Sequence, residues 1–179
     1  RYPHIIRQNR TSVAVLRGTE TAEELRALAA DVFTYYGLGC RNVSKVYVQK
    51  EEQLHAFFDA IADFEWVREH HKYVNNYDYN KSIFLVNKVP HLDTGFLLAR
   101  EEEALVSPIA VLHYGFYEQE ERLKQDLAAR ASEIQCLVAG QPALLEAGTP
   151  LGRWPSVRRS VPAFGIMRTM WTPWPFAFR

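Results

Sequence analysis

Cys40 is the residue whose setting most favours covalent chemistry. It follows two glycines, Gly37 and Gly39, between a run with helical spacing and a run with the composition of a strand. A glycine after a helix is typical of a left-handed cap, and a second glycine permits a tight turn. A thiol on such a turn has a fixed position and a reachable sulfur, as a nucleophile requires. A lone cysteine is also often a small buried hydrophobe, so the local pattern leaves both interpretations open.

The elements that must position Cys40 lie on either side of it. A helix is predicted from Thr21, because Glu24 three residues later completes a capping box. Apolar residues at helical spacing give this helix one face for burial: Leu25, Leu28, Ala29, Val32, Phe33 and Tyr36. From Ser44 the run Val46, Tyr47, Val48 predicts a strand, so the cysteine would sit on a helix–turn–strand unit.

The run Gly-Leu-Gly-Cys-Arg-Asn-Val-Ser-Lys-Val-Tyr-Val at 37–48 resembles the nucleophile segment of acyl-CoA reductases. These are the bacterial fatty-acid reductase type within the aldehyde dehydrogenase superfamily. Residues 71–82 and 89–96 resemble further signature stretches of the same reductases, and the similarity runs from Pro3 to Gly152. The resemblance implies a layered α/β/α, aldehyde-dehydrogenase-like catalytic domain with a mostly parallel sheet. It also implies that Cys40 is the nucleophile.

Substrate contacts are expected near the cysteine and in a polar stretch further on. Residues 73–81 hold three asparagines and three tyrosines and few typical core residues, which predicts a loop. We expect Asn76 and Tyr77 in this stretch, and Asn42 beside Cys40, to bind substrate. The alternative for residues 73–81 is that the asparagines satisfy the backbone of a turn.

The cofactor expectation rests on residues 101–112. They resemble the superfamily segment in which an acid precedes a glycine-proline turn and binds the cofactor ribose. Aligned on Pro108, that acid falls at Ala104, with Glu103 one place earlier and Ser107 in place of the glycine. The resemblance therefore implies NADPH or NADH as cofactor, with Glu103 as the contact from this chain. A solvated acidic loop is the alternative.

A second departure from the superfamily concerns hydrolysis. Aldehyde dehydrogenases that hydrolyse an acyl-enzyme carry a glutamate that activates water, and spacing back from Cys40 puts its position at Arg7. A reductase needs no such water, so Arg7 favours reduction over hydrolysis. The alternative is that Arg7 is a solvated loop residue without a role in the reaction.

Composition narrows the class of protein. The 179 residues are 47% hydrophobic, with 21 basic and 21 acidic side chains, which points to neither nucleic acid nor an anionic membrane. No apolar run approaches the roughly 20 residues of a membrane span. Two cysteines are too few for a disulfide framework, which fits a cytoplasmic location. Adjacent His70 and His71 project apart on a helix and lack a third ligand at metal spacing, so no metal site is expected.

The two ends of the chain carry expectations of their own. We expect residues 1–152 to be the cysteine-bearing catalytic domain, with a cofactor-binding N-terminal half missing. Residues 153–179 have no helical or strand period and hold five basic residues and no acidic one. Read one base out of register, codons for 164–175 can encode the ending typical of the family. We therefore expect a frameshift after Gly152.

The other elements follow from periodicity. Helices are expected at 51–70, with Leu54, Phe57, Phe58, Ile61 and Phe64 on the apolar face, and at 118–131. Strands are expected at 13–16, 83–86, 96–98, 109–114 and 134–138, the last of which buries Cys136, and a turn at 90–95.

The resemblance implies NAD(P)H-dependent reduction of fatty acyl-CoA to fatty aldehyde through an acyl-enzyme on Cys40, with this chain inactive alone. Two alternatives stay open. One is a cysteine acyltransferase or thioesterase that needs no nicotinamide, and the other is a non-catalytic remnant that only associates with other chains. The partners that stay open are further copies of this chain, in a homo-oligomer, and acyl-transfer proteins.

Overall fold

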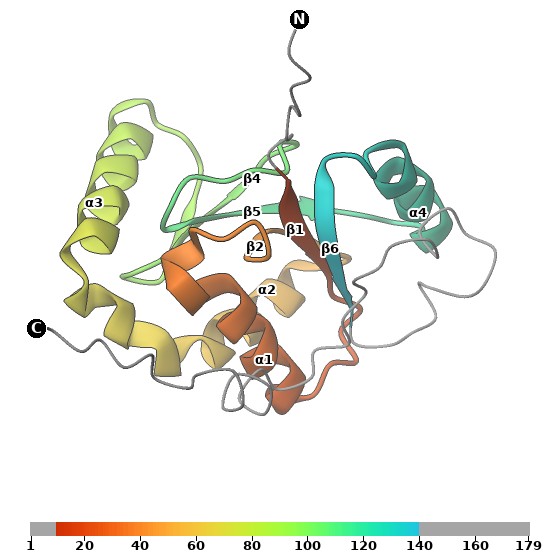
Figure 1. Cartoon of the computed structure of the whole chain (residues 1–179), viewed down its shortest axis with the longest axis horizontal. Coiled ribbons are helices and arrows are strands. Elements are labelled where there is room, and N and C mark those ends of the chain that lie inside the picture. The colour runs from red at the N-terminus through yellow and green to blue at the C-terminus, as the bar shows by residue number, and fades with distance from the viewer. Residues whose placement is uncertain (1–9, 140–179) are drawn as a thin grey trace, which may run out of the picture.

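The sheet is built from the buried, β-branched runs of the chain. The computed structural model describes residues 10–139 (Figure 1). Its strands are β1 (Thr11–Val15), β2 (Val43–Val48), β3 (Leu92–Asp93), β4 (Leu98–Glu101), β5 (Val111–Phe116) and β6 (Ile134–Ala139). They lie in the order β3-β4-β5-β2-β1-β6, and every neighbouring pair is parallel except β3–β4. The predicted α/β class with a mostly parallel sheet is confirmed.

The helices connect these strands and cover both faces of the sheet. They are α1 (Ala22–Phe33), α2 (Glu51–Ala60), α3 (His71–Val86) and α4 (Glu120–Ala129), with 3₁₀ segments η1 (Thr34–Gly37) and η2 (Ala62–Glu69). The predicted capping box of α1 is confirmed, since the Thr21 hydroxyl accepts from the Glu24 N–H and the Glu24 carboxylate accepts from the Thr21 N–H.

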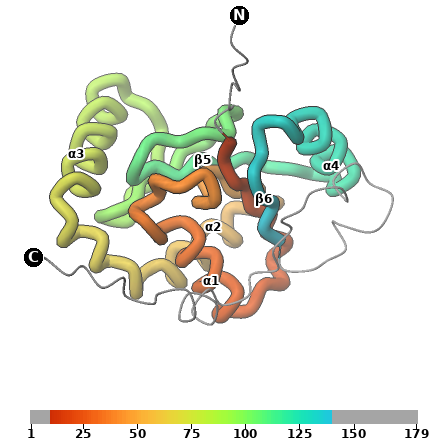
Figure 2. The backbone as a smooth tube through the Cα atoms, viewed as in Figure 1, coloured from red at the N-terminus to blue at the C-terminus, as the bar shows by residue number. Residues whose placement is uncertain are grey.

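The two faces of the sheet belong to two hydrophobic clusters. Ala14 on β1 and Leu16 directly after it pack with α1, α2 and α3, whereas Val13 and Val15 on β1 pack with α4. Alternate side chains of a strand point to opposite faces, so three helices cover one face and α4 covers the other. Figure 1 shows α3 and α4 at opposite sides of the view, and Figure 2 shows β1 and β6, the first and last strands, side by side.

Three local predictions were wrong. Residues 73–81 are not a loop and 83–86 are not a strand, because both belong to α3. The predicted helix at 51–70 is interrupted after Ala60 and continues as η2, although Leu54, Phe57 and Ile61 of its apolar face are fully buried. The remaining predicted strands and helices within 10–139 are present with shifted ends.

Candidate functional site

The turn that carries Cys40 is held by its own neighbours. The Asn42 N–H donates to the Gly39 carbonyl at 2.9 Å, and the Gly39 N–H donates to Asn42 Oδ1 at 2.8 Å. From β1, the Ser12 hydroxyl donates to the Cys40 carbonyl at 3.1 Å. The Cys40 side chain is exposed, and its own N–H donates no hydrogen bond within residues 10–139. The turn therefore presents both a thiol and an unpaired backbone donor beside it.

Asn42 ties this turn to the end of α1. Its Nδ2 donates to the carbonyls of Asp31 at 2.8 Å and Thr34 at 2.7 Å, and the residue is buried. Both amide hydrogens and the amide oxygen are thus engaged within the protein. The side chain positions the turn, and contact of Asn42 with substrate stays a prediction.

Three successive residues before the turn have left-handed backbone. Gly37 has φ +75°, as its predicted role in a cap requires, but Tyr35 and Tyr36 also have φ of 52° and 57°. Each non-glycine residue in this region costs about 1–2 kcal/mol. Tyr36 stacks on His70 with ring centroids 4.0 Å apart, which helps to hold the strained segment. The sequence carries no signal for this strain.

A second segment, residues 101–105, here called the acidic loop, lies against the strand that leaves the cysteine turn. Ser44 donates to the Leu105 carbonyl at 2.6 Å, and Lys45 Nζ donates to the carbonyls of Glu102 at 2.6 Å and Glu103 at 3.0 Å. The register of β1 against β2 shifts at this point, so the consecutive side chains of Ser44 and Lys45 both reach the loop. The structure therefore brings the Cys40 segment and the predicted cofactor segment together.

Two more side chains hold the acidic loop from other elements. His113 on β5 lies with Nδ1 2.9 Å from the Ala104 carbonyl, and Arg130 after α4 donates to the Glu103 carbonyl at 3.1 Å. Glu103 itself is exposed, and in the described part of the chain no hydrogen bond or ion pair engages its carboxylate. That carboxylate is free to accept from a ligand.

Burial and neighbouring charges shift the pKa values of three side chains in and beside the acidic loop. Burial, with the nearby Arg130 guanidinium, lowers the pKa of Lys45 to about 8. The Glu103 N–H and the Arg100 guanidinium lower the pKa of Glu102. Burial lowers the pKa of His113, which favours a neutral ring beside the Ala104 carbonyl.

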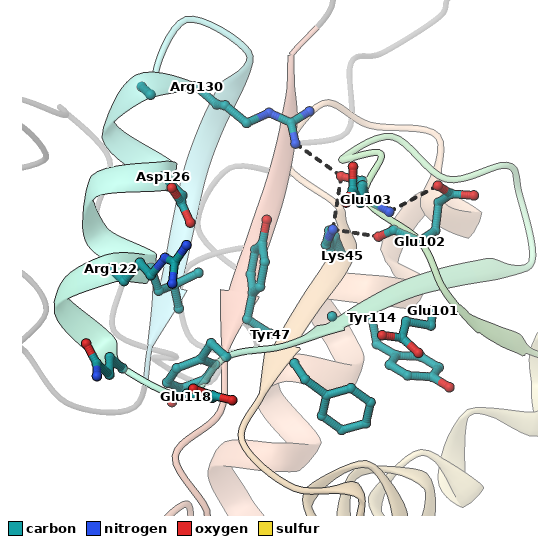
Figure 3. A pocket seen from close by; sticks show the side chains of 16 residues that line it. Lys45, Tyr47, Glu101, Glu102, Glu103, Tyr114, Glu118, Arg122, Asp126 and Arg130 are labelled. Carbon is teal, nitrogen blue, oxygen red and sulfur yellow. Dashed lines mark hydrogen bonds between the residues drawn. The ribbon is translucent and has the colours of Figure 1, made fainter.

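A groove of about 950 Å³ opens between the acidic loop and α4 (Figure 3). Lys45 and Tyr47 lie on its floor, Glu101, Glu102 and Glu103 form one wall, and Arg122, Asp126 and Arg130 form the other. Cys40 does not line this groove, so the thiol and the groove are separate features of the surface.

The other predicted substrate residues lie on α3. The Tyr77 hydroxyl donates to Asp93 at 2.6 Å, and Lys81 forms an ion pair with Asp93 at 2.7 Å. Asn76 Nδ2 donates to the Lys72 carbonyl one turn back. No described contact joins Asn76 or Tyr77 to the cysteine turn, and their binding of substrate stays a prediction.

Sequence reasoning missed Ser12 and His113 as members of this site, and it missed the contact of Lys45 with the acidic loop. All three are buried polar residues on strands. A signal was present for Lys45, because it is the one charged residue in the run Val43–Val48. Arg7 and residues 153–179, which carried other predictions, lie outside the described residues. No group of three or more potential metal ligands occurs within 10–139, and no helix there has the length and apolar character to cross a membrane.

Comparison with solved structures identifies the fold. No protein-family model and no curated protein matches the sequence. An indole-3-acetaldehyde dehydrogenase in complex with NAD⁺ superposes with a TM-score of 0.50 over 74% of this chain, at 9% identity. A cysteine-to-alanine variant of the P. syringae enzyme AldA, in complex with NAD⁺ and IAA, gives the same values. The chain spans 33% of the length of each of these two chains. The described residues therefore have the fold of part of an aldehyde dehydrogenase.

Proposed function

We propose that this chain carries the nucleophile of an NAD(P)H-dependent oxidoreductase that reduces fatty acyl-CoA to fatty aldehyde. The observation that carries the proposal is Cys40, an exposed thiol on a turn fixed by Asn42 and Ser12. The fold shared with aldehyde dehydrogenases and the resemblance of residues 37–48 support it. The chain would act as part of a longer protein.

In the first step, Cys40 Sγ attacks the carbonyl carbon of the acyl-CoA thioester. A new carbon–sulfur bond forms, the bond to CoA breaks, and the thiol proton leaves with the CoA sulfur. The unpaired Cys40 N–H would donate to the oxygen as it becomes negative, which is the usual role of a backbone donor in an oxyanion hole. A second donor would come from outside residues 10–139.

In the second step, the acyl-enzyme is reduced by two electrons. A reduced nicotinamide cofactor, when bound, would supply the hydride that the carbonyl carbon receives while Cys40 holds the acyl group. The carbon–sulfur bond to Cys40 then breaks, which releases the aldehyde and restores the thiolate. Glu103 fits the ribose of such a cofactor, because its exposed carboxylate is free to accept from hydroxyl groups. The remainder of the cofactor would be bound outside the described residues, and the preference for NADPH over NADH stays a prediction.

The alternatives differ in what they consume. A thioesterase or acyltransferase would acylate Cys40 and turn over without nicotinamide, and a non-catalytic remnant would leave Cys40 unmodified. A cytoplasmic location, an oligomer and acyl-transfer partners stay predictions.

The test is the intact mass of the full-length protein, with its reading frame confirmed by DNA sequencing, after incubation with a long-chain acyl-CoA and no cofactor. We expect one acyl adduct that is absent in Cys40→Ala, present in the buried-thiol control Cys136→Ala, and discharged as aldehyde by NADPH. An adduct that water discharges as fatty acid without NADPH would favour the thioesterase. Absence of any adduct on the folded wild-type protein would remove Cys40 as nucleophile.

A further inference from the structure

The acidic loop is held in place through its backbone carbonyls. Four side chains from β2, β5 and the end of α4 contact these carbonyls: Ser44, Lys45, His113 and Arg130. Lys45 alone among them bridges two, at Glu102 and Glu103 (Figure 3). The loop's position therefore depends on a side chain from the strand that begins beside Cys40.

Burial of the Lys45 ammonium group at this position is energetically unfavourable. The residue is only 3% exposed, and taking an ammonium group out of water costs free energy that an apolar side chain of similar length would not incur. Two carbonyl acceptors and the face of Tyr47, 4.9 Å from Nζ, offset part of that cost. A buried strand position is normally filled by an apolar side chain. The presence of a lysine at this one therefore suggests a function, and its contacts place that function at the acidic loop.

We infer that Lys45 is a positioning residue, which sets the acidic loop so that Glu103 can receive the cofactor ribose. This role rests on the proposed function. It makes cofactor binding depend on Lys45, while acylation of Cys40, which uses the thiol, its turn and a donor from outside residues 10–139, does not.

The experiment compares three variants in the full-length enzyme. Lys45→Met removes the donors and keeps the length of the stem, Lys45→Arg keeps the charge, and Lys50→Met alters an exposed lysine five residues along the chain. Three quantities are measured: hydrogen exchange of the peptide that covers 101–107, acylation of Cys40 without cofactor, and the KM for NADPH and for acyl-CoA.

We expect Lys45→Met to speed exchange in the loop and to raise the KM for NADPH about tenfold, the effect of losing a charge-assisted hydrogen bond. Acylation of Cys40 and the KM for acyl-CoA should stay at wild-type values. Lys45→Arg should recover most of the NADPH affinity, and Lys50→Met should match the wild type. Arg130→Gln, at a site where the side chain is 35% exposed, should show the same split to a smaller extent if Lys45→Met does not fold.

Unchanged exchange in the loop, or equal losses for NADPH and acyl-CoA, would overturn the positioning role. If the wild type forms no acyl adduct, the proposed function fails and the cofactor role of Lys45 fails with it. In that case, faster loop exchange in Lys45→Met would show only that the lysine holds the loop. The two failures are thus distinguishable.

Discussion

At the scale of single residues, the site depends on polar side chains that bind backbone rather than each other. The Asn42 side chain donates to two carbonyls at the end of α1 and accepts from the Gly39 N–H. Such groups cost little while paired and much when one partner is removed. The sequence analysis predicted that Asn42 binds substrate, and the sequence alone does not separate that role from support of the turn, because both use the same amide.

Replacement of Asn42 separates these two roles. Asn42→Ala removes the part-buried hydrogen bonds that the Asn42 amide makes with the Gly39 N–H and with the Asp31 and Thr34 carbonyls, so we expect the free energy of unfolding to fall by about 1–3 kcal/mol. Asn42→Asp should cost more, because a carboxylate would then face the Asp31 and Thr34 carbonyls. Urea unfolding measures the loss, and the alkylation rate of Cys40 reports the geometry of the turn. Full stability combined with a raised KM for acyl-CoA alone would instead support the substrate contact.

At the scale of elements, the prediction succeeded where burial is carried by aliphatic residues and failed where it is carried by tyrosine and asparagine. The helix α1 has leucine and valine on its buried face and a capping box, so its period and its start were both predictable. The buried face of α3 consists of Tyr73, Tyr77, Asn80 and Phe84, at helical spacing. Three of these four carry a polar group, and their hydrogen-bond partners lie at Phe96, Asp93 and Ile109. Sequence alone does not reveal those partners, so the stretch resembled a loop.

The link between α3 and the β3–β4 hairpin should depend on pH. Burial opposes ionisation of Asp93, but hydrogen bonds from Lys81 and Tyr77 prevail and lower its pKa from the unfolded value of 3.8. A carboxyl whose pKa is depressed on folding adds stability above the unfolded pKa and loses it as the pH falls through the folded one. We therefore expect Asp93→Asn to be less stable than the wild type at neutral pH, with the difference shrinking as the pH falls below 3.8 and vanishing below the folded pKa.

The measurement for Asp93 is the urea midpoint of both proteins across this range, with Asp78→Asn, an exposed acid on α3, as the control. A difference that persists unchanged at low pH would mean that the amide fails to pack, and not that a charge is lost.

At the scale of the whole molecule, the strands β1 and β2 connect the cysteine turn, the acidic loop and the two hydrophobic clusters. Thr11, Ser12, Ser44 and Lys45 connect the cysteine turn to the acidic loop. The same β1 places Ala14 in the cluster with α1 and α2, and Val13 in the cluster with α4. The sheet order was not predictable from the sequence, because it depends on pairings between strands far apart in the chain. The mostly parallel direction of the strands was predicted, because the family resemblance implied it.

This shared strand makes the two faces of the sheet interdependent, which can be tested from either side. Leu127 on α4 and Leu54 on α2 are both essentially buried, on opposite faces. Truncation of either to alanine should cost about 2–5 kcal/mol, as for other buried leucines. Because β1 packs into both clusters, we expect each variant to speed hydrogen exchange in β2 and in β6 by similar factors. Leu85→Ala, at an exposed position of α3, should change neither.

If Leu127→Ala speeds exchange in α4 and β6 alone, the α4 face opens as a separate unit. The acidic loop, whose Leu105 packs in that same cluster, would then be able to move without disturbing the Cys40 turn.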